Sequence, residues 1–123
     1  MYSRKYSLKT RYNFRKVLNE GETFKTSHLI IRYLKVSDDV FKDEPHKKFA
    51  IIVSNKFSKK AVVQNRVRRV IGEAIRLNLE RFPNNYYYVF IPRKSCLVNE
   101  KPNVHTKEIS AEIDSFLSKM VVA

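Results

Sequence analysis

Residues 48–91 read KFAIIVSNKFSKKAVVQNRVRRVIGEAIRLNLERFPNNYYYVFI and decide the fold. The apolar runs at 48–53 and 86–91 are typical of buried strands. Between them, over 62–82, apolar residues recur at helical spacing until Pro83 and two asparagines interrupt the pattern. The segment therefore predicts a strand–helix–strand unit. Such a unit would most often be a right-handed crossover if its strands are parallel neighbours.

The flanking sequence predicts further elements around this unit. In chain order these are a helix at 11–20 ended by Gly21, a possible strand at 23–26, a strand at 28–36, an acidic surface turn at 37–45, a loop at 96–105 and a last helix at 106–121. The order α-β-β-β-α-β-α indicates an α+β fold, an α/β sandwich with helices against one face of a mostly antiparallel sheet. We expect a single domain over residues 1–123.

The charge of the chain is large and localised. The sequence has 25 Lys and Arg against 12 Asp and Glu, a formal net charge of +13. Residues 1–19 hold six of these cations and residues 45–72 hold eight, and neither window contains an acid. Such concentration favours a polyanionic partner whose affinity depends steeply on salt. We expect a nucleic acid as that partner. A membrane is not expected, because the basic segments lack the apolar face of a membrane-lying helix. DNA is not expected either.

The helix predicted at 62–82 has two chemically different sides. On a helical wheel the side expected to face the sheet carries Val63, Val67, Val70, Ile71, Ala74 and Leu77. The opposite side carries Asn65, Arg69, Gly72 and Arg76, flanked by Arg66 and Arg68 and preceded by Lys56, Lys59 and Lys60. Guanidinium groups bind phosphate bidentately, so this side predicts an RNA-binding ridge. A basic face that serves only solubility is the alternative.

The same residues resemble a known family. Residues 60–69 (KAVVQNRVRR), preceded by 53–56 (VSNK), are similar to the signature segment of the ribonuclease P protein component. Residues 86–94 (YYYVFIPRK) resemble the family's late strand, and its N-terminal pattern is matched by Leu8, Phe14, Val17 and Gly21. Three positions depart from the family pattern and reduce its positive charge. These are Gln64 and Gly72, where arginine is usual or common, and Asn55, where lysine is usual.

The resemblance implies a fold and an activity. The fold would be a sandwich of the kind found in a ribosomal protein domain, with a left-handed βαβ crossover in place of the usual right-handed one. The protein would dock on a catalytic RNA that removes the 5′ leader of precursor tRNA with Mg²⁺, the metal being bound mainly by RNA and substrate. The docking face would include Lys56, Lys60, Asn65, Arg66, Arg68 and Arg69. Phe14 would line a cleft for the single-stranded leader, together with a strand aromatic such as Tyr33.

The residues around Phe14 support this cleft independently. Arg11 and Arg15 flank the ring, and single-stranded RNA is bound by aromatic stacking in a basic groove. The alternative is a core phenylalanine. The tyrosines at 86–88 are interpreted as strand packing rather than as stacking platforms.

The sequence offers no catalytic or metal-binding constellation of its own. The three histidines lack companion ligands at metal-binding spacing, and the acids at 37–45 fit a solvated turn. We therefore expect no catalytic residue and no metal ligand in this chain, and a self-sufficient nuclease is disfavoured. The remaining alternative is a structural or ribosomal RNA-binding protein. The single Cys96, together with a basic N-terminus without an apolar stretch, predicts a cytoplasmic protein without a secretory signal.

Overall fold

The computed structural model describes residues 2–37, 41 and 46–122. Its main feature is a four-stranded sheet in the order β1-β2-β4-β3. The strands are β1 (Glu22–Lys25), β2 (Leu29–Lys35), β3 (Lys47–Ile51) and β4 (Tyr86–Pro92). Neighbours are antiparallel except β3 and β4, which are parallel. The mostly antiparallel sheet and the possible early strand are confirmed.

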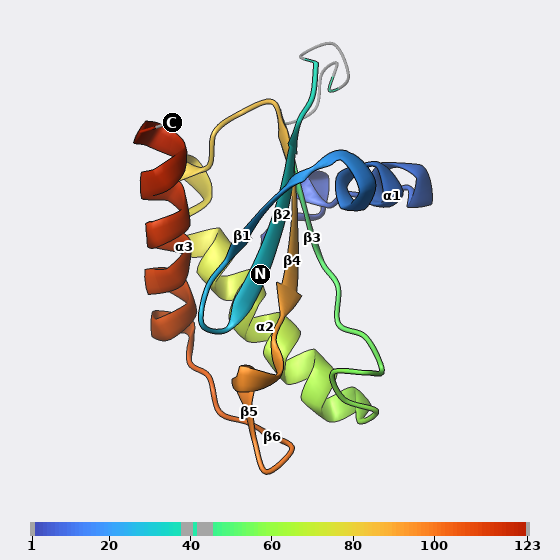
Figure 1. Ribbon diagram of the computed structural model, residues 1–123, viewed down its shortest axis with the longest axis vertical. Coiled ribbons are helices and arrows are strands. Elements are labelled where there is room, and N and C mark those ends of the chain that lie inside the picture. The colour runs from blue at the N-terminus through green and yellow to red at the C-terminus, as the bar shows by residue number, and fades with distance from the viewer. Residues whose placement is uncertain (1, 38–40, 42–45, 123) are drawn as a thin grey trace.

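The helices lie on both faces of this sheet. They are α1 (Arg11–Glu20), α2 (Ala61–Leu77) and α3 (Thr106–Val122). Figure 1 shows α3 on one side of the strands and α1 on the other, with α2 beside α3. The expectation of helices against one face is therefore wrong for α1. The chain passes from β3 through α2 to the parallel neighbour β4, which confirms the βαβ unit. Its left-handed path stays a prediction.

Two cores result from the alternation of side chains along β4. Tyr88 and Phe90 enter the core shared with α2 and α3, whereas Tyr87 and Val89 enter the core beneath α1. In the first core the Tyr88 ring is stacked on Phe49 of β3, with 5.2 Å between ring centroids. Burial raises the pKa of Tyr88, whose hydroxyl donates to the carbonyl of Pro83 at 2.7 Å. The interpretation of the tyrosine run as strand packing is thereby confirmed for its two buried members.

The connection from α1 to the sheet requires a glycine at Gly21. This residue has an ordinary φ of −76°, so no left-handed conformation is involved. A Cβ atom at Gly21 would lie 2.5 Å from the carbonyl oxygen of Val17 and 2.8 Å from that of Tyr33. Close approach of two backbone segments, rather than turn geometry, therefore explains the glycine.

The helix α2 ends earlier than the sequence pattern predicts. Its last residue is Leu77, and a 3₁₀ turn follows at Leu79–Arg81. Asn78 has non-helical backbone angles, and its side-chain amide donates to the carbonyl of Ala74 at 2.8 Å and to the hydroxyl of Ser110 at 2.9 Å. This residue therefore ends α2 and ties it to α3.

The region predicted as a loop at 96–105 contains a short hairpin. It is formed by β5 (Leu97–Val98) and β6 (Lys101–Pro102), after a 3₁₀ turn at Lys94–Cys96. Asn99 and Glu100, between the two strands, have φ values of 53° and 64°. Positive φ at both central residues is the geometry that joins strands in the tightest hairpins. The acidic turn predicted at 37–45 lies outside the described residues except Ser37 and Phe41, the latter buried.

Two lysines of the acid-free window 45–72 are buried in the fold rather than exposed on its surface. Lys47 is 7% exposed and Lys48 is 8% exposed. The Lys47 ammonium donates to the carbonyls of Leu79 and Phe82 at 2.6 and 3.0 Å, and that of Lys48 donates to the carbonyl of Lys5. Burial lowers the pKa of Lys47, against the opposite influence of the Glu80 carboxylate. The cations available to a partner are therefore fewer than the sequence count suggests.

The turn between β1 and β2 is held by Glu112 of α3. One oxygen of this carboxylate accepts the backbone N–H of His28 at 2.8 Å and the hydroxyl of Thr26. Its other oxygen lies 2.5 Å from Nδ1 of His28. Burial acts to raise the pKa of Glu112, but the hydrogen bonds from Thr26 and His28 outweigh it, and the net pKa is lowered.

Replacing this carboxylate should destabilise the protein in a pH-dependent way. Because the pKa of Glu112 is lowered on folding, its charged form stabilises the folded state above its ordinary pKa of 4.5. We expect Glu112→Gln to reduce the free energy of unfolding at pH 7 by about 1–3 kcal/mol. The difference should shrink as the pH falls below that ordinary value.

Urea titrations of both proteins at several pH values measure this difference. Glu20→Gln is the control, because Glu20 is exposed at the end of α1. An unfolding difference that stays constant from pH 7 to pH 3 would contradict the assigned role of the carboxylate.

Candidate nucleic-acid interface

The exposed side of α2 carries the predicted ridge. Asn65, Arg66 and Arg69 are exposed, and Arg68 is half-buried beside them. Nη1 of Arg68 donates to Oδ1 of Asn65 at 3.0 Å, which holds one guanidinium against the amide. The Asn65 amide nitrogen and the remaining guanidinium N–H groups are donors from which phosphate oxygens can accept. The structure thus brings these four residues together.

Two other members of the predicted ridge behave differently. Arg76 is exposed but forms an ion pair with Glu73 one turn earlier, with hydrogen bonds of 2.9 and 2.6 Å. The Arg76 guanidinium lowers the pKa of Glu73 to about 2, so the pair is charged but neutral in sum at pH 7. Gly72 is buried, so its place on the ridge was wrong. The β5–β6 hairpin also contacts α2, and a second side of the helix is thereby covered.

The sheet-facing side of α2 is also shifted from the predicted one. Ile75 is fully buried, whereas Leu77, predicted to face the sheet, is 57% exposed. Leu77 is the last residue of the helix and a 3₁₀ turn follows it at Leu79–Arg81, so the helical wheel no longer describes its environment. The predicted core positions Val63, Val67 and Ile71 are buried as expected.

A basic loop precedes α2 and continues the ridge. Lys56, Lys59 and Lys60 are all exposed there. Lys60 is the N-cap residue of α2, its side chain makes no capping hydrogen bond, and the first helical turn contains no acidic residue. Backbone N–H groups at a helix start attract anions, and three ammonium groups beside them add to the same potential.

The residues predicted for a leader cleft fall on two different faces. Phe14 is partly buried against the core beneath α1, and Arg11 and Arg15 are exposed on the same helix. Tyr33 points to the opposite side of the sheet, where its ring lies 5.1 Å from that of Phe116 of α3. Its assignment to the cleft of Phe14 was therefore wrong. Successive side chains of β2 alternate between faces, and the sequence did not indicate which set faces α1.

Arg32 of β2 takes the place predicted for Tyr33 on the α1 side. Its guanidinium donates to the carbonyl of Leu18 at 2.5 Å, to that of Val17 at 3.3 Å and to the hydroxyl of Thr23. These carbonyls belong to the last turn of α1, where an arginine is favoured by the helix dipole. Arg32 thus fixes α1 on the sheet. A charged residue within an apolar strand was the only sequence signal for this role.

The α1 side of the sheet is hollowed next to the start of α1. A cavity of about 250 Å³ is lined by Ser7, Leu8, Lys9, Thr10, Asn13, Phe41, Lys48 and Tyr87. The hydroxyl of Thr10 accepts the N–H of Asn13 at 3.1 Å and caps the helix. The cavity combines the apolar and aromatic side chains of Leu8, Phe41 and Tyr87 with polar and basic groups, as a surface for single-stranded nucleic acid does.

Three features bear on the class of site, namely the possible metal ligands, the cysteine and the apolar length of the helices. Among residues 2–37, 41 and 46–122, no group of three or more His, Cys, Asp or Glu is placed to hold a metal ion. Cys96 is buried, which raises the pKa of its thiol to about 11. Within the same ranges no helix is long and apolar enough to cross a membrane.

The α+β sandwich with a basic ridge and a basic loop defines an RNA-binding protein. The family model for ribonuclease P matches residues 2–121. The ribonuclease P protein component of Clostridioides difficile is 40% identical over 95 residues, 76% of this chain and 77% of that protein. That of Petrotoga mobilis is 31% identical over 119 residues and covers 97% of this chain and 94% of its own length. The chain belongs to the ribonuclease P protein family and is a subunit of a ribonucleoprotein endoribonuclease.

Solved structures show the same fold. The ribonuclease P protein of Thermotoga maritima superposes with a TM-score of 0.73 at 23% identity, over 92% of this chain and 96% of that one. The protein of Staphylococcus aureus gives a TM-score of 0.70 at 17% identity, over 94% of each chain. The α+β sandwich expected from the sequence is confirmed.

The ridge should matter more for RNA binding than net charge. We expect Arg69→Ala to weaken binding of the ribonuclease P RNA by about tenfold, as loss of a charged hydrogen bond does, while the fold is kept. Lys107→Ala is the control, because Lys107 is an exposed cation of α3 that lies beside Leu77 and Asn78, at the end of α2, and is not a member of the ridge. Lys119 is less suitable, since its ammonium lies 5.2 Å from the Phe24 ring centroid.

Filter binding at fixed salt measures both variants. Equal losses for Arg69→Ala and Lys107→Ala would mean that only total charge matters, and the ridge would not be a site.

Proposed function

We propose that this chain binds two RNAs on its two sides, the catalytic RNA subunit through α2 and the 5′ leader of precursor tRNA through α1. The single observation that carries the proposal is the separation of the two basic surfaces by the sheet. The ridge and loop belong to the side of α2, whereas Phe14 and its neighbouring arginines belong to α1. One RNA can occupy each side without displacing the other.

The docking surface for the catalytic RNA is assigned residue by residue. It comprises Lys56, Lys59, Lys60, Asn65, Arg66, Arg68 and Arg69. The assignment is supported by their position on one continuous loop and helix, where all of them are exposed except Arg68, which is partly exposed. Arg76 has a weaker place in this set, because Glu73 already neutralises it. Phosphate contacts of this kind fix orientation without reading sequence.

The leader surface is assigned to the α1 side of the sheet. Phe14 is partly buried at the margin of the core, and the exposed Arg11 and Arg15 on the same helix supply cations. The partly buried Ile52 and Ile91 on the same face provide apolar surface for unpaired bases. Arg32 is a positioning residue here, since it anchors the end of α1 on β2. A single-stranded leader would lie along this face, bound by stacking and by backbone contacts.

The chemistry of cleavage is assigned to the RNA partner. The chain supplies guanidinium, ammonium and aromatic groups on its surface, which hold RNA but do not activate water. Mg²⁺, bound mainly by the catalytic RNA and the substrate, would activate the attacking water. The role of the protein is then to raise the affinity for precursor tRNA and to bring anionic RNA segments together at lower Mg²⁺ concentration. The complex is proposed to act in the cytoplasm, with this chain as one domain over residues 1–123.

Reconstitution tests this division of labour. End-labelled precursor tRNA is incubated with protein alone, with the cognate RNA subunit alone and with both, over a range of Mg²⁺ concentrations. We expect one cut, at the 5′ end of the mature tRNA, and a much larger rate with both components at low Mg²⁺.

Two outcomes would contradict this proposal in different ways. Specific cleavage by RNA-free protein would place catalysis in this chain. If the protein gave no gain at any Mg²⁺ concentration, it would be a structural RNA-binding protein instead.

A further inference from the structure

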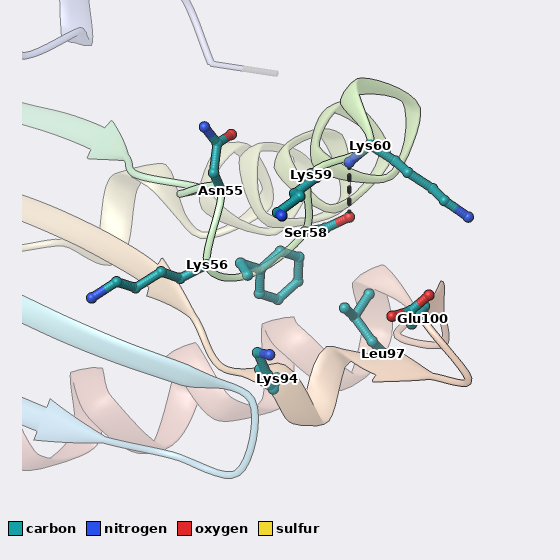
Figure 2. Close-up of a pocket in the computed structure, with 9 residues that line it drawn as sticks. Asn55, Lys56, Ser58, Lys59, Lys60, Lys94, Leu97 and Glu100 are labelled. Atoms are coloured by element: carbon teal, nitrogen blue, oxygen red, sulfur yellow. Dashed lines mark hydrogen bonds between the residues drawn. The ribbon is translucent and has the colours of Figure 1, made fainter.

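A second concave site lies beside the ridge, between the basic loop and the β5–β6 hairpin. It is a cavity of about 600 Å³ lined by Asn55, Lys56, Phe57, Ser58, Lys59, Lys60, Lys94, Leu97 and Glu100. Figure 2 shows Asn55, Ser58 and Lys59 on one side and Lys94, Leu97 and Glu100 on the other. Its volume falls within the range of about 300–1,000 Å³ typical of small-ligand sites. Sequence reasoning missed Lys94, Leu97 and Glu100, because their segment was predicted as a strand end and a loop.

The lining of this cavity is mostly basic, with one carboxylate. Lys56, Lys59 and Lys94 lie toward one end, whereas Lys60 and Glu100, the latter on the tip of the hairpin, lie toward the other (Figure 2). Phe57, 7% exposed, and the half-buried Leu97 supply apolar surface. Ammonium groups bind phosphate, apolar surface accepts a base, and a carboxylate accepts hydrogen bonds from O–H or N–H donors. A nucleotide has these three parts.

The loop side of the cavity is ordered by hydrogen bonds of its own. Nε2 of Gln64 donates to Oδ1 of Asn55 at 3.2 Å and to the carbonyl of Ser58 at 2.5 Å. The N–H of Lys60 donates to the hydroxyl of Ser58 at 3.2 Å. Gln64 and Asn55, two of the departures from the family pattern, thus bond to each other and hold the loop on α2. A site that is ordered before binding loses less entropy when it is occupied.

The hairpin side is held in a costly conformation. Glu100 has a φ of 64°, in the left-handed region that favours glycine or asparagine. A residue of this kind in that region costs of the order of 1 kcal/mol or more, and such residues gather at functional sites. The turn places the Glu100 carboxylate at the margin of a cavity whose other charged groups are all cations.

We propose that this cavity receives one nucleotide of an RNA strand, with its phosphate on the lysines and a ribose or base donor on Glu100. This inference rests on the proposed RNA-binding function and deepens it. The base lies against Phe57 and Leu97, and the carboxylate accepts from a ribose 2′-hydroxyl or a base N–H group. The catalytic RNA is the expected source of this nucleotide, because Lys56, Lys59 and Lys60 belong to its proposed docking surface, and precursor tRNA is the other outcome of the test.

Three variants of the full chain distinguish a nucleotide site from general attraction to phosphate. Lys94→Ala removes a cation of the cavity, and Lys101→Ala removes an exposed cation of the same hairpin that does not line the cavity. Glu100→Ala removes the proposed acceptor and a negative charge. Affinities are measured by fluorescence anisotropy for the catalytic RNA alone, and for precursor tRNA with the assembled complex. Thermal melting confirms that each variant is folded.

The sign of the Glu100 effect decides the matter. We expect Glu100→Ala to weaken binding of one of the two RNAs about fivefold, although the protein becomes more positive, and Lys94→Ala to weaken it about tenfold. Lys101→Ala should change it by less than about twofold. The RNA that loses affinity is the source of the nucleotide. Tighter binding by Glu100→Ala, or equal effects of Lys94→Ala and Lys101→Ala, would overturn the proposal.

The same experiment distinguishes an error in the nucleotide-site proposal from an error in the proposed RNA-binding function. If Arg69→Ala weakens the same titrations while the Lys94 and Glu100 variants behave like the Lys101 control, the ridge binds RNA and the cavity does not. If the unsubstituted protein binds neither RNA, both the proposed function and this inference are wrong.

Discussion

The structure depends on burying β4 on both faces between β2 and β3. Seven residues of β2 pair with it on one side and five of β3 on the other. Because its side chains alternate, one strand supplies Tyr88 and Phe90 to the core of α2 and α3, and Tyr87 and Val89 to the core of α1. A shift of one residue in either pairing would exchange the two sets and leave neither core filled. The register of β4 therefore fixes which helix lies on which side.

The same constraint separates the two surfaces proposed to bind RNA. α2 presents Arg69 and Asn65 away from the sheet, and α1 presents Arg11 and Arg15 on the far side. Cations that lie within the fold are satisfied by backbone carbonyls, as at Lys47. The exposed cations of the ridge and the basic loop are the ones proposed to bind RNA, and their mutual repulsion would be relieved when phosphates bind. In the part of the chain that the structure describes, the two buried lysines thus both donate to backbone carbonyls.

Much of this was predictable from the sequence, for physical reasons. The bounds of α1, the βαβ unit and the exposed ridge of α2 follow from periodicity and charge, which depend on neighbouring residues alone. The misplacement of Tyr33, Gly72 and Leu77 has a different origin. Whether a strand residue faces one core or the other, or a helix residue is covered by a distant hairpin, depends on tertiary pairing. The cavity beside Glu100 was missed for the same reason, because its two sides lie about forty residues apart in the chain.

In the proposed function, α1 binds the leader while α2 binds the catalytic RNA. The decisive measurement compares the affinities of the assembled complex for precursor and mature tRNA, with Phe14→Ala and with Phe14→Leu, which keeps apolar packing but removes the ring. We predict that both variants weaken precursor binding by about 1–3 kcal/mol and leave mature tRNA binding and RNA assembly nearly unchanged. Equal weakening of precursor and mature tRNA binding would contradict the proposed leader site. Lost thermal stability with an unchanged preference for precursor would also contradict it, and would indicate that Phe14 is a core residue.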